Sequence, residues 1–480
     1  MSRLFFLGLV LLTSQFAVGQ TLQEKVDQFA GDYALRHGNV SICVIDVAAN
    51  QVVADYRAEH TAIPASALKA VTTATALALL GPDYRFATEL QYDGSIAGGR
   101  LNGNLYIKGF GDPTLGSDRI KGNPDFSALF DSWVKDIRQK GIETITGAII
   151  GDDTHFDSQG AVDTWQWADL GNYYAAGAHG LNIRDNQYTL YFDRNGQVGS
   201  QPRIIRTDPD IPWLEWVNEV RIAGPRTGDQ AYIYGSPYTY LRYVRGTIPA
   251  GSGLFDIKGS IPDPALLTAF YLRQYLLQAQ VKVDGGETTL KPGIGSDRRR
   301  VIRRYTAPPL REIVTEANLR SVNLYCEALI KEIGRQAGDG GSTEAGTEAV
   351  LAFWADRGVD VAGIYLADGS GLSARNAVSA RFLAEIMRKV AVDDKIAGVF
   401  KQSLPRAGFS GNLVNKFRDT AAYGRLYAKS GTIGRVRSYT GYFTGRNDRD
   451  YAFAVLVNNY TSSGASIRRR MDDLLQSLCE

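Results

Sequence analysis

A serine and a lysine three residues apart are the first candidates for catalysis. Ser66 and Lys69 lie in the segment PASALK, at the start of an Ala- and Leu-rich stretch that reaches Leu80. On a helix, residues i and i+3 share a face, so Lys69 is expected to lie over the hydroxyl of Ser66. An amine held neutral by burial can take the proton of a serine hydroxyl. The spacing predicts a serine nucleophile with its own base, and the backbone N–H of Ser66 as an oxyanion donor.

Two further motifs follow in an informative order. Ser321 and Asn323 form an S-x-N motif in a predicted helix, and residues 429–432 read KSGT on a predicted strand. The order S-x-x-K, S-x-N, K-[ST]-G is typical of serine penicillin-recognising enzymes. The hydroxyl of Ser321 can relay a proton to a leaving amine, the amide of Asn323 can hold a peptide group, and Lys429 adds positive charge. We therefore predict Ser66, Lys69, Ser321 and Lys429 as catalytic residues.

The strand motif also supplies candidate substrate-binding residues, namely Ser430, Gly431 and Thr432. Gly431 has no Cβ, so a substrate backbone could lie against the strand at this point. Thr432 can offer its N–H to an oxyanion and its hydroxyl to a terminal carboxylate.

Each motif has a structural alternative. Ser321 and Asn323 are also good helix-capping residues, and Lys429 could be an exposed strand residue. Ser132 repeats the S-x-x-K spacing inside another predicted helix, which we interpret as a surface pair. Residues 410–412 form another S-x-N, but the surrounding GFSGNL is typical of a loop, so Ser321 is preferred.

Several longer segments extend the pattern along the chain. They are PASALK, LRSVNLYCEALIKEIG, DGSGLS at 368–373, LPRAGFSGNL before the KSG strand, and GDPTL at 111–115. With these segments the chain resembles the class C low-molecular-mass penicillin-binding proteins, the D-alanyl-D-alanine carboxypeptidase/endopeptidases of the penicillin-binding protein 4 type. The long interval between Ser66 and Ser321 matches the large insertion that this family carries there.

The resemblance implies acyl transfer to water on peptidoglycan stem peptides. Ser66 would attack the carbonyl between two D-alanines, or at a D-Ala–diamino-acid crosslink, and β-lactams would acylate the same hydroxyl and persist. It implies no cofactor and no metal. The partners would be peptidoglycan peptides and β-lactam antibiotics as covalent inhibitors, and the oligomeric state stays open.

The chain departs from the family pattern at a few positions. Val322 replaces the Asp of S-D-N, and the Arg that often follows DGSGLS is replaced by Ala374. The family's W-x-D-x-x-x-x-aromatic motif matches Trp167, Asp169 and Tyr174. The resemblance implies that Asp169 binds the amino group of a diamino acid, while a turn or cap role is the structural alternative.

The elements around these motifs predict one α/β (α+β) domain of the serine β-lactamase/transpeptidase type, split by a large β-rich insertion of one or two smaller domains. Hydrophobic periodicity and turn signals predict helices at 21–36, 67–80, 125–140, 264–280, 310–335, 343–357, 379–391 and 465–478, and strands at 39–46, 51–56, 425–429, 436–444 and 451–458. The predicted division is a signal peptide at 1–19, the first part of the transpeptidase-like domain at 20–83, the insertion at 84–300 and the second part at 301–480. The first and last strands are expected to meet in one sheet.

Composition excludes several classes of protein. Lys plus Arg number 53 and Asp plus Glu 51, a net charge of +2, which argues against a nucleic-acid partner. Four His without metal-ligand spacing argue against a zinc site. Cys43 and Cys326 are expected to be buried thiols, and the disulfide status of these two and Cys479 stays open.

Residues 1–19 carry Arg3, a short apolar run and small residues at Ala17 and Gly19. This pattern predicts a secretory signal and an exported protein, periplasmic or extracellular. Two other functions remain as alternatives. A serine β-lactamase would use the same acyl-enzyme, and a catalytically silent cell-wall-binding protein would not use it at all.

Overall fold

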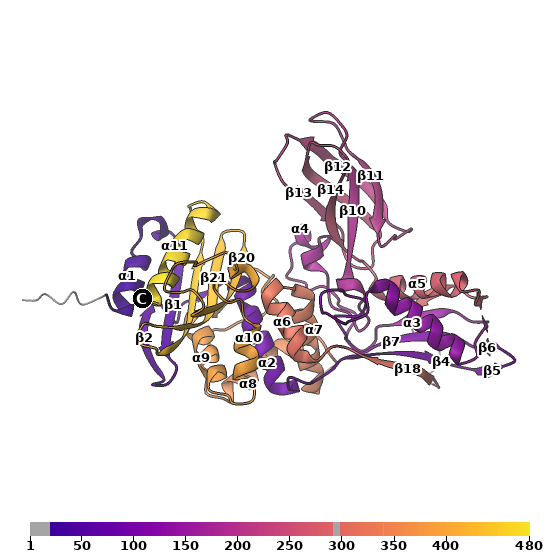
Figure 1. Ribbon diagram of the computed structural model, residues 1–480, viewed down its shortest axis with the longest axis horizontal. Helices are drawn as coiled ribbons and strands as arrows, with labels where there is room; N and C mark the ends of the chain where they lie inside the picture. The colour runs from indigo at the N-terminus through magenta and orange to yellow at the C-terminus, as the bar shows by residue number, and fades with distance from the viewer. Residues whose placement is uncertain (1–19, 291–297, 339) are drawn as a thin grey trace, which may run out of the picture.

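The computed structural model describes residues 20–290, 298–338 and 340–480, so the signal predicted at 1–19 lies outside the described residues. Its first unit is a five-stranded antiparallel sheet built from both ends of the chain (Figure 1). The strands in order across the sheet are β2 (Gln51–Tyr56), β1 (Asn39–Asp46), β22 (Asp450–Asn458), β21 (Val436–Thr444) and β20 (Leu426–Ile433). The predicted meeting of the first and last strands is confirmed.

Helices cover both faces of this sheet. Alternate side chains of β1 point to opposite faces, so Ile42 joins one apolar cluster and Cys43 the other. The face of Ile42 packs on α1 (Leu22–Ala30) and α11 (Gly464–Leu478). On the opposite face α9 (Ala380–Ala391) contacts β1, β21 and β22, and one apolar cluster continues from there into the helices α2 (Lys69–Leu80), α6 (Leu310–Arg320), α7 (Asn323–Gln336), α8 (Thr343–Ala355) and α10 (Ala397–Ser403).

Two differences from the predicted helices bear on the site. The helix expected from 310 to about 335 is two helices, because Ser321 adopts a left-handed conformation (φ 58°, ψ 43°) between α6 and α7. The start of the helix expected at 67–80 is a 3₁₀ turn, η2 (Ala65–Leu68), which runs directly into α2.

The insertion contains two units. The first has the five-stranded sheet β17-β9-β7-β4-β18 and the small sheet β16-β8-β6-β5, with α3 and α5 packed beside them (Figure 1). The bounds of these elements are β4 (Ala87–Tyr92), β5 (Ser95–Ala97), β6 (Arg100–Asn102), β7 (Leu105–Gly109), α3 (Phe126–Gln139), β8 (Thr144–Ile145), β9 (Ile149–Asp152), α5 (Pro264–Gln278), β16 (Lys282–Val283), β17 (Glu287–Thr289) and β18 (Arg300–Thr306). Because β18 pairs with β4, residues 300–306 join the sheet of the insertion; the boundary at 300 stays a prediction.

The second unit, which we call the lobe, projects away from the rest of the molecule (Figure 1). It consists of two three-stranded sheets that share one apolar cluster. The sheets are β11 (Arg203–Asp208), β10 (Gln187–Asp193), β15 (Leu254–Ser260) and, facing them, β12 (Glu215–Ala223), β14 (Leu241–Pro249), β13 (Gln230–Tyr234). Among the described residues, no helix has the length and apolar character needed to cross a membrane.

Candidate active site

Ser66 and Lys69 meet at the junction of η2 and α2. Lys69 Nζ lies 3.0 Å from Ser66 Oγ, the contact that the i, i+3 spacing predicts. Ala65, just before the serine, has a left-handed backbone (φ 46°). A strained residue beside a reactive hydroxyl is common where the surrounding structure fixes a functional geometry.

Lys69 is fully buried and is held by two carbonyl oxygens. Its Nζ donates to Asn323 Oδ1 and to the backbone oxygen of Ser370, each at 2.6 Å. Burial lowers the pKa of Lys69 below its usual value. A neutral amine has two hydrogens and one lone pair. Because both carbonyls can only accept, they take the hydrogens and leave the lone pair for the hydroxyl of Ser66.

The second motif and the third motif also meet at this point. Lys429 Nζ, on β20, donates to Ser321 Oγ at 3.0 Å and to the Ser430 carbonyl at 2.8 Å. Lys429 is 2% exposed, and burial lowers its pKa well below the usual value, with the nearby positive charge of Lys69 adding to the effect. Ser321 forms a left-handed turn between α6 and α7, and this turn directs its hydroxyl toward β20.

Asn323 connects the catalytic lysine to the insertion. It is the first residue of α7, and its Nδ2 donates to the backbone oxygen of Tyr174 at 2.6 Å while its Oδ1 accepts from Lys69. Both ends of this amide are therefore engaged by the protein.

The DGSGLS loop forms the wall behind Lys69. The carboxylate of Glu327, on α7, accepts from the backbone N–H groups of Gly369 (3.2 Å) and Ser370 (2.8 Å). Burial and the neighbouring charge of Asp368 raise the pKa of Glu327 to about 7. Gly371 packs so closely on η2 that an added Cβ would lie 1.9 Å from the Ala65 oxygen. The loop thus fixes the carbonyl that holds Lys69, a role the sequence motif alone did not reveal.

A cationic pocket adjoins the KSGT strand. It is lined by Asn412, Lys416, Ser430, Gly431, Thr432, Arg437, Tyr439 and Arg468. Arg437 on β21 lies opposite Thr432 on β20 and donates to its hydroxyl. Asn412 Nδ2 donates to the Ser430 hydroxyl. Asn412 belongs to the S-x-N at 410–412, which the sequence predicts to be a loop. It does lie in a loop turn, but that turn borders the site.

Gly431 has a structural role that differs from the predicted one. A Cβ there would lie 2.5 Å from the Pro64 oxygen and 2.8 Å from the Ala67 nitrogen. The missing side chain therefore lets β20 pack against η2, which brings the strand to the nucleophile.

Asp169 lies on the short helix α4 (Trp167–Leu170) of the insertion and is half-buried. Its Oδ1 accepts from the Tyr174 hydroxyl at 3.0 Å, and burial raises the pKa of Asp169. Asp169 is therefore bonded directly to Tyr174, whose backbone carbonyl accepts from Asn323.

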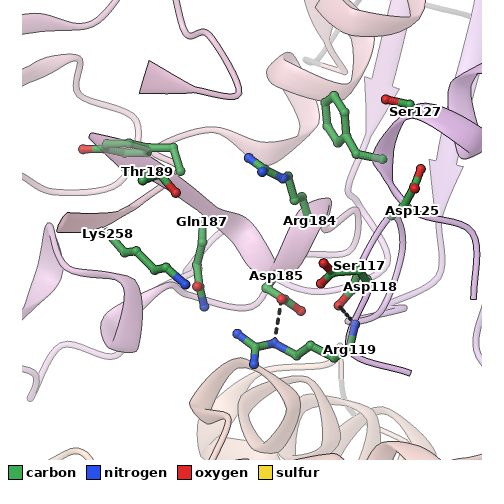
Figure 2. A pocket seen from close by; sticks show the side chains of 13 residues that line it. Ser117, Asp118, Arg119, Asp125, Ser127, Arg184, Asp185, Gln187, Thr189 and Lys258 are labelled. Atoms are coloured by element: carbon green, nitrogen blue, oxygen red, sulfur yellow. Dashed lines mark hydrogen bonds and ion pairs between the residues drawn. The ribbon is translucent and has the colours of Figure 1, made fainter. Parts of the chain in front are cut away.

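Other contacts fix the insertion to the catalytic helices. Trp165 Nε1 donates to Asp368 Oδ2 at 2.9 Å. A second contact with the catalytic helices starts from a polar pocket at the start of the lobe. Figure 2 shows that Arg119 and Asp185 point toward one another in this pocket. Arg119 Nε lies 2.7 Å from Asp185 Oδ2, and Asp185 Oδ1 accepts from the hydroxyl of Tyr325 on α7 at 3.1 Å.

The remaining sequence predictions can be located. Ser132 and the exposed Lys135 lie on α3, and Ser132 donates to the Leu129 carbonyl, as a surface pair would. All three cysteines are buried and free.

Comparison with known proteins identifies relatives along nearly the whole chain. The profile of the D-Ala-D-Ala carboxypeptidase 3 (S13) family matches residues 22–478. The D-alanyl-D-alanine carboxypeptidase of Actinomadura sp. (strain R39) is 28% identical over 454 residues, which cover 92% of this chain and 81% of that protein. D-alanyl-D-alanine carboxypeptidase DacB of Haemophilus influenzae is 23% identical over 448 residues, or 91% and 89% of the two chains.

The fold has a counterpart among solved structures. Penicillin binding protein 4 (dacB) from Haemophilus influenzae superposes with a TM-score of 0.80 at 21% sequence identity, covering 94% of this chain and 98% of that chain. This likeness confirms the predicted α/β fold with its insertion, and the family match confirms the predicted serine-type D-Ala-D-Ala carboxypeptidase. The chain belongs to the D-Ala-D-Ala carboxypeptidase 3 (S13) family.

Proposed function

We propose that this carboxypeptidase cleaves peptidoglycan stem peptides through an acyl-enzyme on Ser66. The observation that carries the proposal is the pair of 3.0 Å contacts, Lys69 to Ser66 and Lys429 to Ser321, in a buried site. Ser66 Oγ attacks the carbonyl of the penultimate D-alanine as its proton passes to the neutral amine of Lys69. The N–H groups of Ser66 and Thr432 stabilise the oxyanion.

The same proton then completes the departure of the leaving group. As the C–N bond breaks, Lys69 returns the proton, and Ser321 beside Lys429 relays it to the leaving amine, so that D-alanine departs with a neutral amine and its carboxylate and then takes a second proton from water. Water then attacks the ester, and its proton restores the hydroxyl of Ser66. The cationic pocket beside Thr432 suits the terminal carboxylate of the substrate, which Thr432 and Arg437 would bind.

β-Lactams are the expected covalent inhibitors. The β-lactam carbonyl would acylate Ser66 in the same way, and the leaving amine stays attached to the ring-opened drug. A structure of the Haemophilus influenzae penicillin binding protein 4 has been solved in complex with a β-lactam, at 20% identity to this chain. If the protein were instead a β-lactamase, it would turn nitrocefin over rapidly rather than stay acylated.

Asp169 is the residue that would extend the activity to crosslinks. Its half-buried carboxylate, next to the segment that holds Asn323, could pair with the free amino group of a diamino acid. We propose this as the basis of D,D-endopeptidase activity. Digestion of crosslinked dimers would be weakened by Asp169→Asn, while release of D-alanine from a pentapeptide whose third residue has no free amino group would be kept.

The substrate also determines where the protein works. Peptidoglycan lies outside the cytoplasmic membrane, so we propose that the protein is exported, with residues 1–19 as its signal.

The central test is Ser66→Ala. This variant should lose labelling by a fluorescent penicillin and release no D-alanine from a stem pentapeptide, whereas Ser132→Ala should keep both activities, because Ser132 lies on α3 of the insertion. Turnover by Ser66→Ala, or failure of the unchanged protein to be labelled, would overturn the mechanism; the second result would favour a silent cell-wall-binding protein.

A further inference from the structure

The solvent face of the sheet β12-β14-β13 is rich in aromatic residues. The strands alternate, so that Ile233 and Val244 enter the core of the lobe while Tyr232, Tyr234 and Tyr243 point outward. The aromatic platform, as we call this surface, consists of Trp167, Tyr232, Tyr234, Tyr243 and Arg245. Trp167 and Tyr232 are 53% and 44% exposed, and they lie on the same surface as the half-buried Tyr234 and Tyr243, so the exposed rings form one patch rather than lying singly.

The platform is ordered around one arginine. Tyr232 faces Arg245 and Tyr234 faces Tyr243 across the β13-β14 ladder. The guanidinium carbon of Arg245 lies 5.2 Å, 5.4 Å and 5.9 Å from the ring centres of Tyr243, Tyr234 and Trp167. Glu219 pairs with Arg245 from β12. The result is a set of ring faces with hydroxyl groups and an ion pair among them.

A short chain of hydrogen bonds ties the platform to the active site. The Asn172 side chain pairs with both backbone groups of Ile233, at 3.0 and 3.1 Å, and so fixes β13 to the segment after α4. Two residues later, the Tyr174 carbonyl accepts from Asn323, which in turn holds Lys69. α4 lies at the base of the lobe, on the side of α6 and α7 (Figure 1). The platform is therefore linked to the site through the short segment from Asn172 to Tyr174.

We propose that the aromatic platform binds the glycan strand of peptidoglycan, the sugar polymer from which the stem peptide extends. This inference rests on the proposed function. A sugar ring has apolar C–H faces and a polar rim, and it matches an aromatic face with a polar tip at its edge. The ion pair of Arg245 and Glu219 offers donors and an acceptor to ring hydroxyls and N-acetyl groups.

Other occupants fit these residues less well. A lipid surface would favour an apolar face with a cationic rim, whereas the centre of the platform holds an ion pair. Cross-strand support of the sheet explains the pairs Tyr234–Tyr243 and Tyr232–Arg245. It does not explain Trp167, which comes from α4 and packs on Tyr234 with a ring-centre distance of 4.8 Å.

The test compares binding to sugar with hydrolysis of peptide. The double variant Tyr232→Ala/Tyr243→Ala truncates two rings but keeps Tyr234 against Trp167. The matched control is Tyr33→Ala, since Tyr33 is also exposed and also lies under an arginine, at the distant α1 end of the chain. Binding is measured by co-sedimentation with glycan strands whose peptides have been removed by an amidase, and kcat/KM is measured on a sugar-free stem pentapeptide.

We expect the double variant to bind the peptide-free glycan about tenfold more weakly or worse, with the peptide kcat/KM unchanged and the control equal to the unchanged protein. Equal glycan binding by the double variant would overturn the inference, as would a parallel loss of peptide hydrolysis, which would assign the rings to the peptide site. Failure of the unchanged protein to hydrolyse the peptide would count against the proposed function alone, because glycan binding is read independently. Circular dichroism and the melting temperature confirm that the variants are folded.

Discussion

At the scale of single residues, the fixed partners of Lys69 decide its chemistry. Two carbonyl oxygens at 2.6 Å accept from its Nζ whatever its charge, so only a third position faces Ser66. When the amine is charged, a third hydrogen occupies that position. When it is neutral, a lone pair does, and only then can it accept the serine proton.

The rate of acylation should therefore rise with pH. The pKa of Lys69 is lowered by burial, so the neutral form accumulates as pH rises through this lowered value, and kcat/KM with a chromogenic β-lactam should rise and then level off. The free energy of unfolding should also rise with pH. The unfolded chain binds the proton more tightly than the folded one, so the burial of Lys69 costs less free energy as pH rises toward the unfolded pKa.

The check is Lys69→Arg, which stays charged at every accessible pH. It should lose about 10²–10⁴-fold in acylation rate, the usual contribution of a general base, and lose the rise with pH. The matched change Lys135→Arg, at the exposed S-x-x-K of α3, should leave both unchanged. An acylation rate for Lys69→Arg that still climbs with pH would contradict this assignment.

The residue scale is also where the sequence was most informative. The contact between Ser66 and Lys69 could be predicted from helix geometry alone. The contact between Ser321 and Lys429 could be predicted only from the order of the motifs along the chain. Asn412 was not predicted as a neighbour of Ser430, since a loop leaves no periodic signal to say which strand it borders.

At the scale of elements, the site depends on the break between α6 and α7 and on the close packing of β20 against η2. The sequence predicted one helix over 310–335, but the chain breaks it at Ser321 in a left-handed turn. No helix-breaking residue marks the break in the sequence. In this conformation the Ser321 hydroxyl accepts from Lys429 on β20, a contact made across the fold that periodicity alone cannot reveal.

Ser321→Gly and Ser321→Ala separate the turn from the hydroxyl. Both remove the proton relay, so both should slow acylation by a β-lactam to a similar extent. Glycine adopts a left-handed backbone without strain, so Ser321→Gly should be more stable than Ser321→Ala by about 1 kcal/mol in urea unfolding. Full acylation by either variant would remove Ser321 from the mechanism.

Gly431 tests the contact between β20 and η2. In Gly431→Ala, the new Cβ would press on the backbone at Pro64 and Ala67, so the strand must move away from Ser66. We expect at least a tenfold slower acylation in a protein that still folds, because misplacement of about 1 Å costs rate on the order of 10²-fold. Gly398→Ala on α10, where a Cβ meets nothing within 4 Å, is the control and should acylate normally. Normal rates for Gly431→Ala would show that the close approach is not required.

At the scale of the whole molecule, the insertion contacts the residues that hold Lys69 in place. The sequence located it by its change of texture and predicted one or two small domains, but it could not reveal which contacts join them to the catalytic helices. These contacts are made between residues more than a hundred positions apart, such as Trp165 with Asp368 and Asp185 with Tyr325. No local pattern encodes such pairs.

Trp165→Phe tests whether the insertion supports catalysis. The exchange keeps one aromatic ring and removes the N–H that Trp165 donates to Asp368 across the interface, and it also leaves a small buried void. Asp368 also accepts from the backbone N–H groups of Gly371 and Ser373, so a shift of its carboxylate would move the loop whose Ser370 carbonyl holds Lys69. We expect acylation by a fluorescent penicillin to slow several-fold, and the melting temperature to fall because the smaller ring leaves a buried void.

The matched control is Trp133→Phe in α3. Trp133 is also fully buried in the insertion, but its N–H has no hydrogen-bond partner among the described residues, so the exchange removes no contact to the catalytic helices. Its acylation rate should equal that of the unchanged protein. If both variants slowed equally, the effect would come from packing within the insertion. If neither slowed, the Trp165–Asp368 hydrogen bond would not support Lys69 and would serve only to join the two parts of the fold.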